Sequence, residues 1–162
     1  MSKLDEVVEN KDQLIQYLED GCKPKNLWKI GTEHEKFGFK KSNLTPLPYK
    51  GSCSILSVLK GLIDTFGWKP IEENNVIIGL KKGAANVTLE PGGQLELSGA
   101  LLENVHETCF EVATHLAEVK TIADRIGAGF IGLGAAPEWL HTQMPKMPKD
   151  RYKLMAPYME KV

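Results

Sequence analysis

Two glutamates spaced two positions apart, Glu33 and Glu35, are the first residues of this sequence whose types and spacing could do chemistry. They lie in residues 28–40, an aromatic-rich segment that we expect to form a strand. Alternate residues of a strand point to one face, so the carboxylates would lie about 7 Å apart beside Phe37 and Phe39. If that face is covered, their repulsion requires a raised pKa or a cation. Magnesium suits this pattern, since it usually takes one or two carboxylates and fills its other positions with water and phosphate oxygens.

A second polar pattern occupies residues 88–98, which read Thr-Leu-Glu-Pro-Gly-Gly-Gln-Leu-Glu-Leu-Ser. Gln94, Glu96 and Ser98 alternate with two leucines, so these three polar side chains would share one face of a strand. Glu90 stands directly before Pro-Gly-Gly, where the backbone can turn sharply or approach a ligand closely. For both patterns the alternative is an ordinary strand with one face in water, the commoner position of charged side chains.

The histidines and cysteines predict no zinc site and no nucleophilic catalysis. Three cysteines, an odd number, are widely separated along the chain at Cys22, Cys53 and Cys109, so we expect reduced thiols. Cys109 falls on the apolar stripe of a predicted helix and is expected to be buried there. Residues 127–132 match the glycine pattern of dinucleotide-binding folds, but a helix precedes them and a strand follows, which is the wrong context.

The elements that must position the acidic residues are predicted by periodicity and by turn residues. Apolar side chains recur at helical spacing in residues 4–18, 55–66 and 103–126, and each stretch is followed by a glycine suited to a helix end. Short strand candidates separated by turn residues lie at 68–71, 76–80, 86–89 and 94–98, with a further strand at 130–133 and a helix at 150–159. This mixture favours an α+β fold, an antiparallel sheet with helices packed on one face.

Composition is that of a globular protein and names no function. Hydrophobic residues make up 42% of the 162 residues and charged residues 25%, with a formal net charge of −1. That charge gives no reason to expect nucleic acid or an anionic membrane as a partner. The first nine residues are acidic and lack the pattern of a signal or transit peptide, so the sequence predicts a cytosolic protein.

The two acidic motifs, read as whole strings, resemble glutamate–cysteine ligases of the plant and alphaproteobacterial type. The resemblance is carried by residues 28–39, Trp-Lys-Ile-Gly-Thr-Glu-His-Glu-Lys-Phe-Gly-Phe, and by residues 89–99, Leu-Glu-Pro-Gly-Gly-Gln-Leu-Glu-Leu-Ser-Gly. Two weaker stretches, 106–109 and 147–155, agree with it. The similarity extends from about Trp28 to the end of the sequence.

The resemblance implies a glutamine-synthetase-like fold, in which a curved antiparallel sheet holds magnesium ions that bridge ATP and the substrate glutamate. It implies ATP-dependent joining of the L-glutamate γ-carboxylate to the L-cysteine amine, the first step of glutathione synthesis. Carried over by position, the acids of the two motifs become candidate magnesium ligands, and two polar neighbours become candidate substrate or supporting contacts. The ligands are Glu33, Glu35, Glu90 and Glu96, and the neighbours are Gln94 and Ser98. Plant members also carry a regulatory disulfide, and Cys109 lies in the matching helix.

The same resemblance implies that residues 1–162 are the N-terminal part of one catalytic domain, since family enzymes run to several hundred residues. We therefore expect the partner of this chain to be the C-terminal part of the same enzyme, and the isolated chain to be inactive. Two alternatives stay open at this point. One is a ligase of the same superfamily with another acceptor amine, and the other is an inactive fragment.

Overall fold

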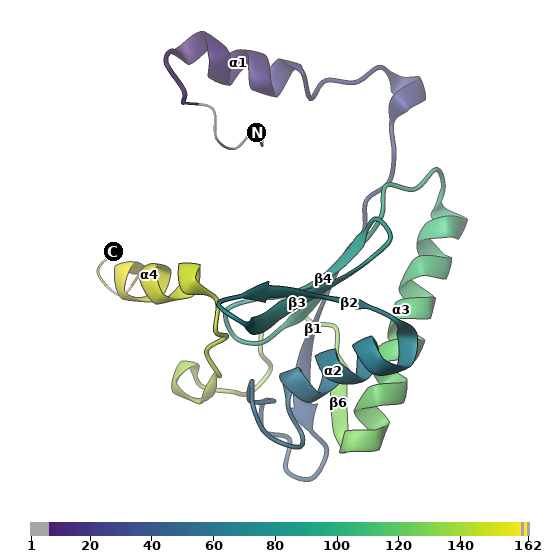
Figure 1. The fold of residues 1–162 in the computed structure, drawn as a ribbon, viewed down its shortest axis with the longest axis vertical. Coiled ribbons are helices and arrows are strands. Elements are labelled where there is room, and N and C mark those ends of the chain that lie inside the picture. The colour runs from purple at the N-terminus through teal and green to yellow at the C-terminus, as the bar shows by residue number, and fades with distance from the viewer. Residues whose placement is uncertain (1–6, 160, 162) are drawn as a thin grey trace.

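A six-stranded antiparallel sheet forms the centre of the computed structural model, which describes residues 7–159 and residue 161 (Figure 1). In spatial order the strands are β2 (Lys69–Glu73), β3 (Val76–Lys82), β4 (Ala85–Leu89), β5 (Leu95–Ser98), β1 (Glu33–Lys40) and β6 (Ala128–Ile131). The predicted meander is confirmed as β2 to β5, and β1 then pairs with both β5 and β6. The fold is α+β, as predicted, and is consistent with part of a glutamine-synthetase-like domain.

Two helices, α2 (Ile55–Phe66) and α3 (Val105–Ile126), pack on one face of the sheet and on each other. Their boundaries follow the sequence signals. Ser54 caps α2 by accepting a hydrogen bond from the backbone N–H of Ser57, and both helices end at a glycine with a φ of 73°. Alternate residues of β4 and β5 enter the core beneath them, at Val87, Leu89, Leu95 and Leu97. The other alternate residues of these strands therefore face away from α2 and α3.

The expected strand at residues 28–40 is shorter in the structure. β1 begins at Glu33, and upstream of it Ile30 makes only an isolated bridge to Leu102. Ordered pairing can start only where β5 provides a partner, and the pairing with β5 reaches no further than Glu33 opposite Ser98.

An N-terminal arm, residues 7–29, projects away from the sheet (Figure 1). It contains α1 (Lys11–Glu19) and a 3₁₀ turn, η2 (Lys25–Leu27), and none of the α1 side chains is buried. The predicted helix at 4–18 is thus shorter at its start, where Asn10 caps it. Positions 1–6 lie outside the described residues.

The C-terminal segment lies at the end of the sheet where the β2–β3 and β4–β5 turns meet. After a 3₁₀ turn, η3 (His141–Gln143), the predicted last helix is confirmed as α4 (Asp150–Met159). The Asp150 backbone N–H donates to Glu73 Oε2 at 2.6 Å, and the Tyr152 hydroxyl donates to the Leu89 carbonyl at 2.8 Å. These bonds fix the start of α4 beside the acidic motif at Glu90.

Cys109 lies near the start of α3. Cys109 is exposed, so its prediction as a buried thiol was wrong. The buried residues of α3 lie between His115 and Ala123, and its first turns extend past the core. Within residues 7–159, no helix is both long and apolar enough to span a bilayer.

Candidate functional site

The two acidic motifs meet on the sheet face that points away from α2 and α3. The β1–β5 register places Glu35 directly opposite Glu96, and Glu33 opposite Ser98. Directly opposed residues of antiparallel strands have Cα atoms about 4.5–5.5 Å apart and side chains on the same face. The register thus brings together two glutamates that are far apart in the sequence, on what we call the acidic face.

Glu90 joins this face through the turn between β4 and β5. Its backbone N–H donates to the Gln94 carbonyl at 3.0 Å, and its own carbonyl accepts from the Gly93 N–H at 2.9 Å. Gly93 has a φ of 85°, a conformation that favours glycine, and a Cβ at Gly92 would lie 2.6 Å from the end of Met144. The Pro-Gly-Gly run is therefore needed for a tight turn packed under residues 144–147, and it sets Glu90 at the same end of the sheet as Glu96.

The electrostatics of Glu35 show that three of the four acids are neighbours. Burial raises the pKa of the Glu35 carboxyl, the negative charges of Glu90 and Glu96 raise it further, and the charge of Lys36 acts in the opposite direction. Each of these three glutamates is partly buried, whereas Glu33 is exposed at the start of β1. The acidic face thus places carboxylates that repel one another close together, and a bound cation would relieve that repulsion.

Ser98 and Gln94 occupy different positions around these acids. The Ser98 hydroxyl donates to Glu96 Oε1 at 2.9 Å and thereby orients that carboxylate. Gln94 Oε1 is buried and has no hydrogen-bond partner within the part of the chain that the structure describes. An unpartnered buried amide oxygen costs about 1–3 kcal/mol, so Gln94 has an unused acceptor available for a ligand.

Basic side chains from the C-terminal segment approach the acids, and sequence reasoning did not single them out. Arg151 Nη2 lies 3.9 Å from Glu90 Oε1, and Lys149 is buried. Burial lowers the pKa of Lys149, the nearby Arg151 lowers it further, and Glu90 and Glu96 act in the opposite direction. The signal in the sequence was the Lys-Asp-Arg-Tyr run at 149–152, in one of the weaker stretches of resemblance.

Lys36 lies beneath the acids, on the helix-facing side of β1. Its ammonium is fully enclosed and donates to the carbonyls of His34 at 3.0 Å and Leu95 at 3.1 Å. Burial lowers the pKa of Lys36 to about 8, although Glu96 and Glu35 act to raise it. A cation thus sits behind the carboxylates, where it partly offsets their repulsion.

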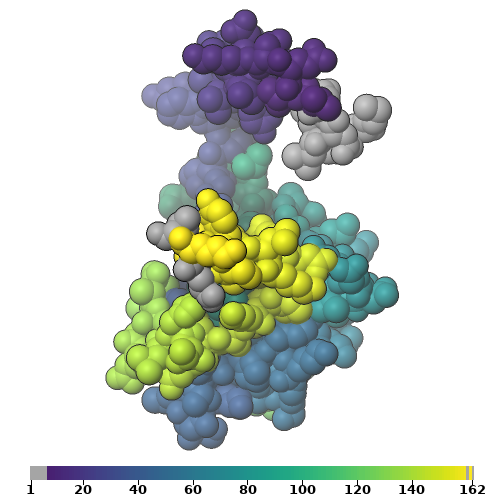
Figure 2. Space-filling model, turned by 90° about the vertical axis from the view of Figure 1, so that its left-hand side faces the viewer, coloured from purple at the N-terminus to yellow at the C-terminus, as the bar shows by residue number. Residues whose placement is uncertain are grey.

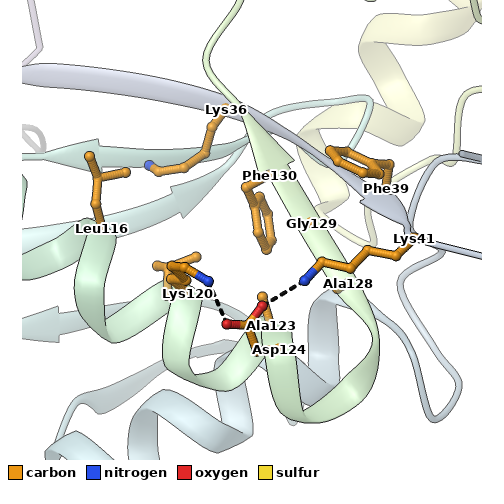
Figure 3. Close-up of a pocket in the computed structure, with 11 residues that line it drawn as sticks. Lys36, Phe39, Lys41, Leu116, Lys120, Ala123, Asp124, Ala128, Gly129 and Phe130 are labelled. Carbon is orange, nitrogen blue, oxygen red and sulfur yellow. Dashed lines mark hydrogen bonds and ion pairs between the residues drawn. The ribbon is translucent and has the colours of Figure 1, made fainter.

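A cavity of about 340 Å³ adjoins Lys36 between α3 and the strands β1 and β6 (Figure 3). Ion pairs from Asp124 to Lys41 at 2.6 Å and to Lys120 at 2.5 Å lie at its outer rim. It is lined on the inside by Phe130 and other apolar groups. Because it lies on the helix side of the sheet, it is separate from the acidic face.

Magnesium was expected at Glu33, Glu35, Glu90 and Glu96. Over residues 7–159, no three His, Cys, Asp or Glu side chains converge closely enough to hold an ion together. The donor set nevertheless fits magnesium, which prefers hard oxygen ligands and needs only one or two carboxylates when phosphate and water fill the remaining positions. The repulsion of Glu35 by Glu90 and Glu96 supports the same fit. The four ligands and the two supporting residues stay a prediction.

Comparison with known proteins agrees with these motifs. A sequence model described as glutamate-cysteine ligase family 2 matches residues 29–162. The chain is 51% identical over 152 residues to glutamate–cysteine ligase A, chloroplastic, of Oryza sativa subsp. japonica. It is 50% and 49% identical, again over 152 residues, to the chloroplastic glutamate–cysteine ligases of Medicago truncatula and Arabidopsis thaliana.

These alignments cover 94% of this chain but only 28–30% of the three relatives, so the chain spans less than a third of their length. The relatives are named chloroplastic, which contradicts the prediction of a cytosolic protein. That prediction rested only on the composition of the first nine residues.

Proposed function

Because the chain belongs to glutamate-cysteine ligase family 2, we propose that it supplies the acidic residues of a site that joins L-glutamate to L-cysteine as ATP is converted to ADP and phosphate. The observation that carries the proposal is the strand register, which sets Glu35 opposite Glu96 with Glu90 at the same end of the sheet. The rest of the site would come from the sequence that the longer relatives possess beyond this segment.

The proposed reaction has two steps. A γ-carboxylate oxygen of glutamate attacks the γ-phosphorus of ATP, so that γ-glutamyl phosphate forms and ADP leaves. The cysteine amine then attacks the γ-carbonyl carbon, the C–O bond to phosphate breaks, and the nitrogen loses a proton as the amide forms. Phosphoryl transfer depends mainly on positioning and charge neutralisation, so a site of carboxylates without an activated nucleophile suits this chemistry.

In this proposal Glu35, Glu90 and Glu96 would hold magnesium, and Glu33 would add a fourth carboxylate at the start of β1. Bound magnesium would neutralise the phosphate charge that these carboxylates would otherwise repel. Ser98 orients Glu96 through its 2.9 Å hydrogen bond, and the free Gln94 oxygen would accept a hydrogen bond from substrate. Arg151, near Glu90, would balance charge at the same edge.

The test uses residues 1–162 joined to the part of the rice ligase that follows the aligned segment. Formation of γ-glutamylcysteine is measured as the magnesium concentration is varied, for the unchanged chimera and for Glu96→Gln. We expect the variant to lose roughly a hundredfold or more in kcat/KM, because a metal contact supplies several kcal/mol in the transition state. It should also need more magnesium for half-maximal rate.

Glu72→Gln is the matched control, because Glu72 is an exposed glutamate on the edge strand β2. Its rate and magnesium dependence should equal those of the unchanged chimera. A folded chimera that forms no product, or a Glu96→Gln variant indistinguishable from Glu72→Gln, would refute the proposal.

A further inference from the structure

The N-terminal arm projects from the molecule (Figures 1 and 2), and it carries a set of large apolar side chains that are exposed. Figure 2 shows that a narrow connection joins it to the sheet domain. The exposed fractions are 81% for Val7, 71% for Tyr17, 73% for Leu18 and 64% for Trp28. A segment with this many exposed apolar groups and no buried side chain in its helix has the character of an interaction surface.

Helix α1 has a defined apolar side. Leu14, Ile15 and Leu18 are spaced for one face, and Gln16 lies on the opposite side. Asn10 and Gln13 form a reciprocal capping box at its start, so the sequence specifies a helix here. A helix of nine residues is nevertheless marginal in water without a surface to pack on.

A hollow of about 280 Å³ lies at the root of the arm. Its walls include Leu27 and Trp28 of the arm and Leu101 from the loop after β5. The Trp28 indole N–H donates to the Lys23 carbonyl at 2.8 Å, which fixes the ring in place, while Leu101 is 71% exposed. A segment that covered this hollow would contact the arm and the sheet domain together.

The relatives are much longer than the segment that they share with this chain. Their alignments include 152 of the 162 residues, so at most ten residues at the two ends lie outside, and α1 at Lys11–Glu19 lies inside. The relatives therefore share the sequence of α1, and about 70% of the rice protein lies outside the aligned segment, since this chain covers 30% of it.

We propose that the apolar side of α1 and the hollow at its root pack against the remaining part of the longer enzyme, so that the arm ties the two parts together. This inference shares with the proposed function only the longer chain that both require. Its test does not depend on turnover, so failure of one leaves the other intact.

Amide hydrogen exchange in α1 measures this packing. The isolated chain is compared with the rice chimera described above, and with chimeras that carry Leu18→Lys or Gln16→Lys. The two substitutions introduce the same side chain on opposite sides of α1. We expect α1 to exchange at least roughly tenfold more slowly in the chimera than in the isolated chain. Leu18→Lys should remove that protection, and Gln16→Lys should keep it.

Three results would overturn the inference. Exchange of α1 could be equally fast in the chimera and in the isolated chain. The two lysine substitutions could have the same effect. Protection in the isolated chain could rise with its concentration and be lost in Leu18→Lys, which would identify a second copy of the chain as the occupant.

Discussion

Acid should destabilise the fold through His115, a buried histidine of α3. Its side chain is 3% exposed, and neither ring nitrogen has a hydrogen-bond partner within the described part of the chain. The Trp68 ring packs against it edge-on, with 6.2 Å between centroids. Burial, together with smaller contributions from the charges of Lys36 and His34, lowers the pKa of His115 from 6.5 to about 3.

The direction of the change in stability with pH depends on which state of the chain binds the proton. Below pH 6.5 this histidine takes up a proton in the unfolded chain but stays neutral in the folded chain. The free energy of unfolding therefore decreases as the pH is lowered from 6.5 to about 3. Each proton changes stability by up to about 1.4 kcal/mol per pH unit, which gives a loss of about 2 kcal/mol between pH 7 and pH 5. Above pH 6.5 the protonation of His115 therefore causes little loss in the free energy of unfolding.

Urea unfolding of the 1–162 chain at pH 7, 6 and 5 tests this loss against two variants. His115→Leu should flatten the pH dependence by about 2 kcal/mol over that range, with little loss at pH 7, because it removes two unpartnered nitrogens. Ile122→Ala, in the buried part of the same helix, should lower stability by about 2–5 kcal/mol at every pH and keep the slope. If His115→Leu retains the slope of the unchanged chain, the reasoning is refuted.

Three further changes have defined expected outcomes. Gly61→Ala should lower the free energy of unfolding in urea by about 1–3 kcal/mol, because its Cβ would lie 2.4 Å from Ile122 Cγ2; unchanged stability would show that α2 and α3 separate easily. Ser54→Ala should cost about 1 kcal/mol in the same assay through loss of the α2 cap, and Ser52→Ala, two positions earlier, should cost less. Glu96→Gln should lower the pKa of Glu35, followed by carbon-detected NMR, since one of the charges that raise that pKa is removed; an unshifted titration would contradict the proximity of the two groups.

Local signals in the sequence predicted most elements of the fold. Ser54 and the glycines at 67 and 127 mark the ends of α2 and α3, where a cap or a left-handed residue is needed. The turn residues between β2 and β5 likewise predicted an antiparallel meander. These features depend on neighbours within a few positions, so they could be predicted from the sequence.

Features that depend on distant partners were harder to predict. The pairing of β6 with β1 was not foreseen, because nothing near Ala128 identifies its neighbour in the sheet. Cys109 and the apolar side of α1 follow helical patterns, yet both are exposed in the structure. A periodic pattern predicts that a helix has an apolar side, but it does not predict which surface covers that side.

For the candidate site, alternation along the strands predicted which acids share a face. Their convergence required the register of β1 on β5, and the approach of Arg151 and Lys149 required the position of α4. Neither can be read from spacing within a motif.

The pairing of β1 with β5 has a consequence for how the protein folds. Glu35 and Glu96 are opposite each other in the sheet but 61 positions apart in the chain. The β2–β5 hairpins can form from local contacts, whereas β1 can join them only after the loop containing α2 has closed, at a cost in chain entropy. During synthesis the acidic face would therefore be completed only after β5 has emerged, and folding intermediates that contain the meander alone would lack Glu35. Substitutions that weaken the contact of β1 with β5 should slow the rate-limiting step of folding more than those within the β2–β3 hairpin.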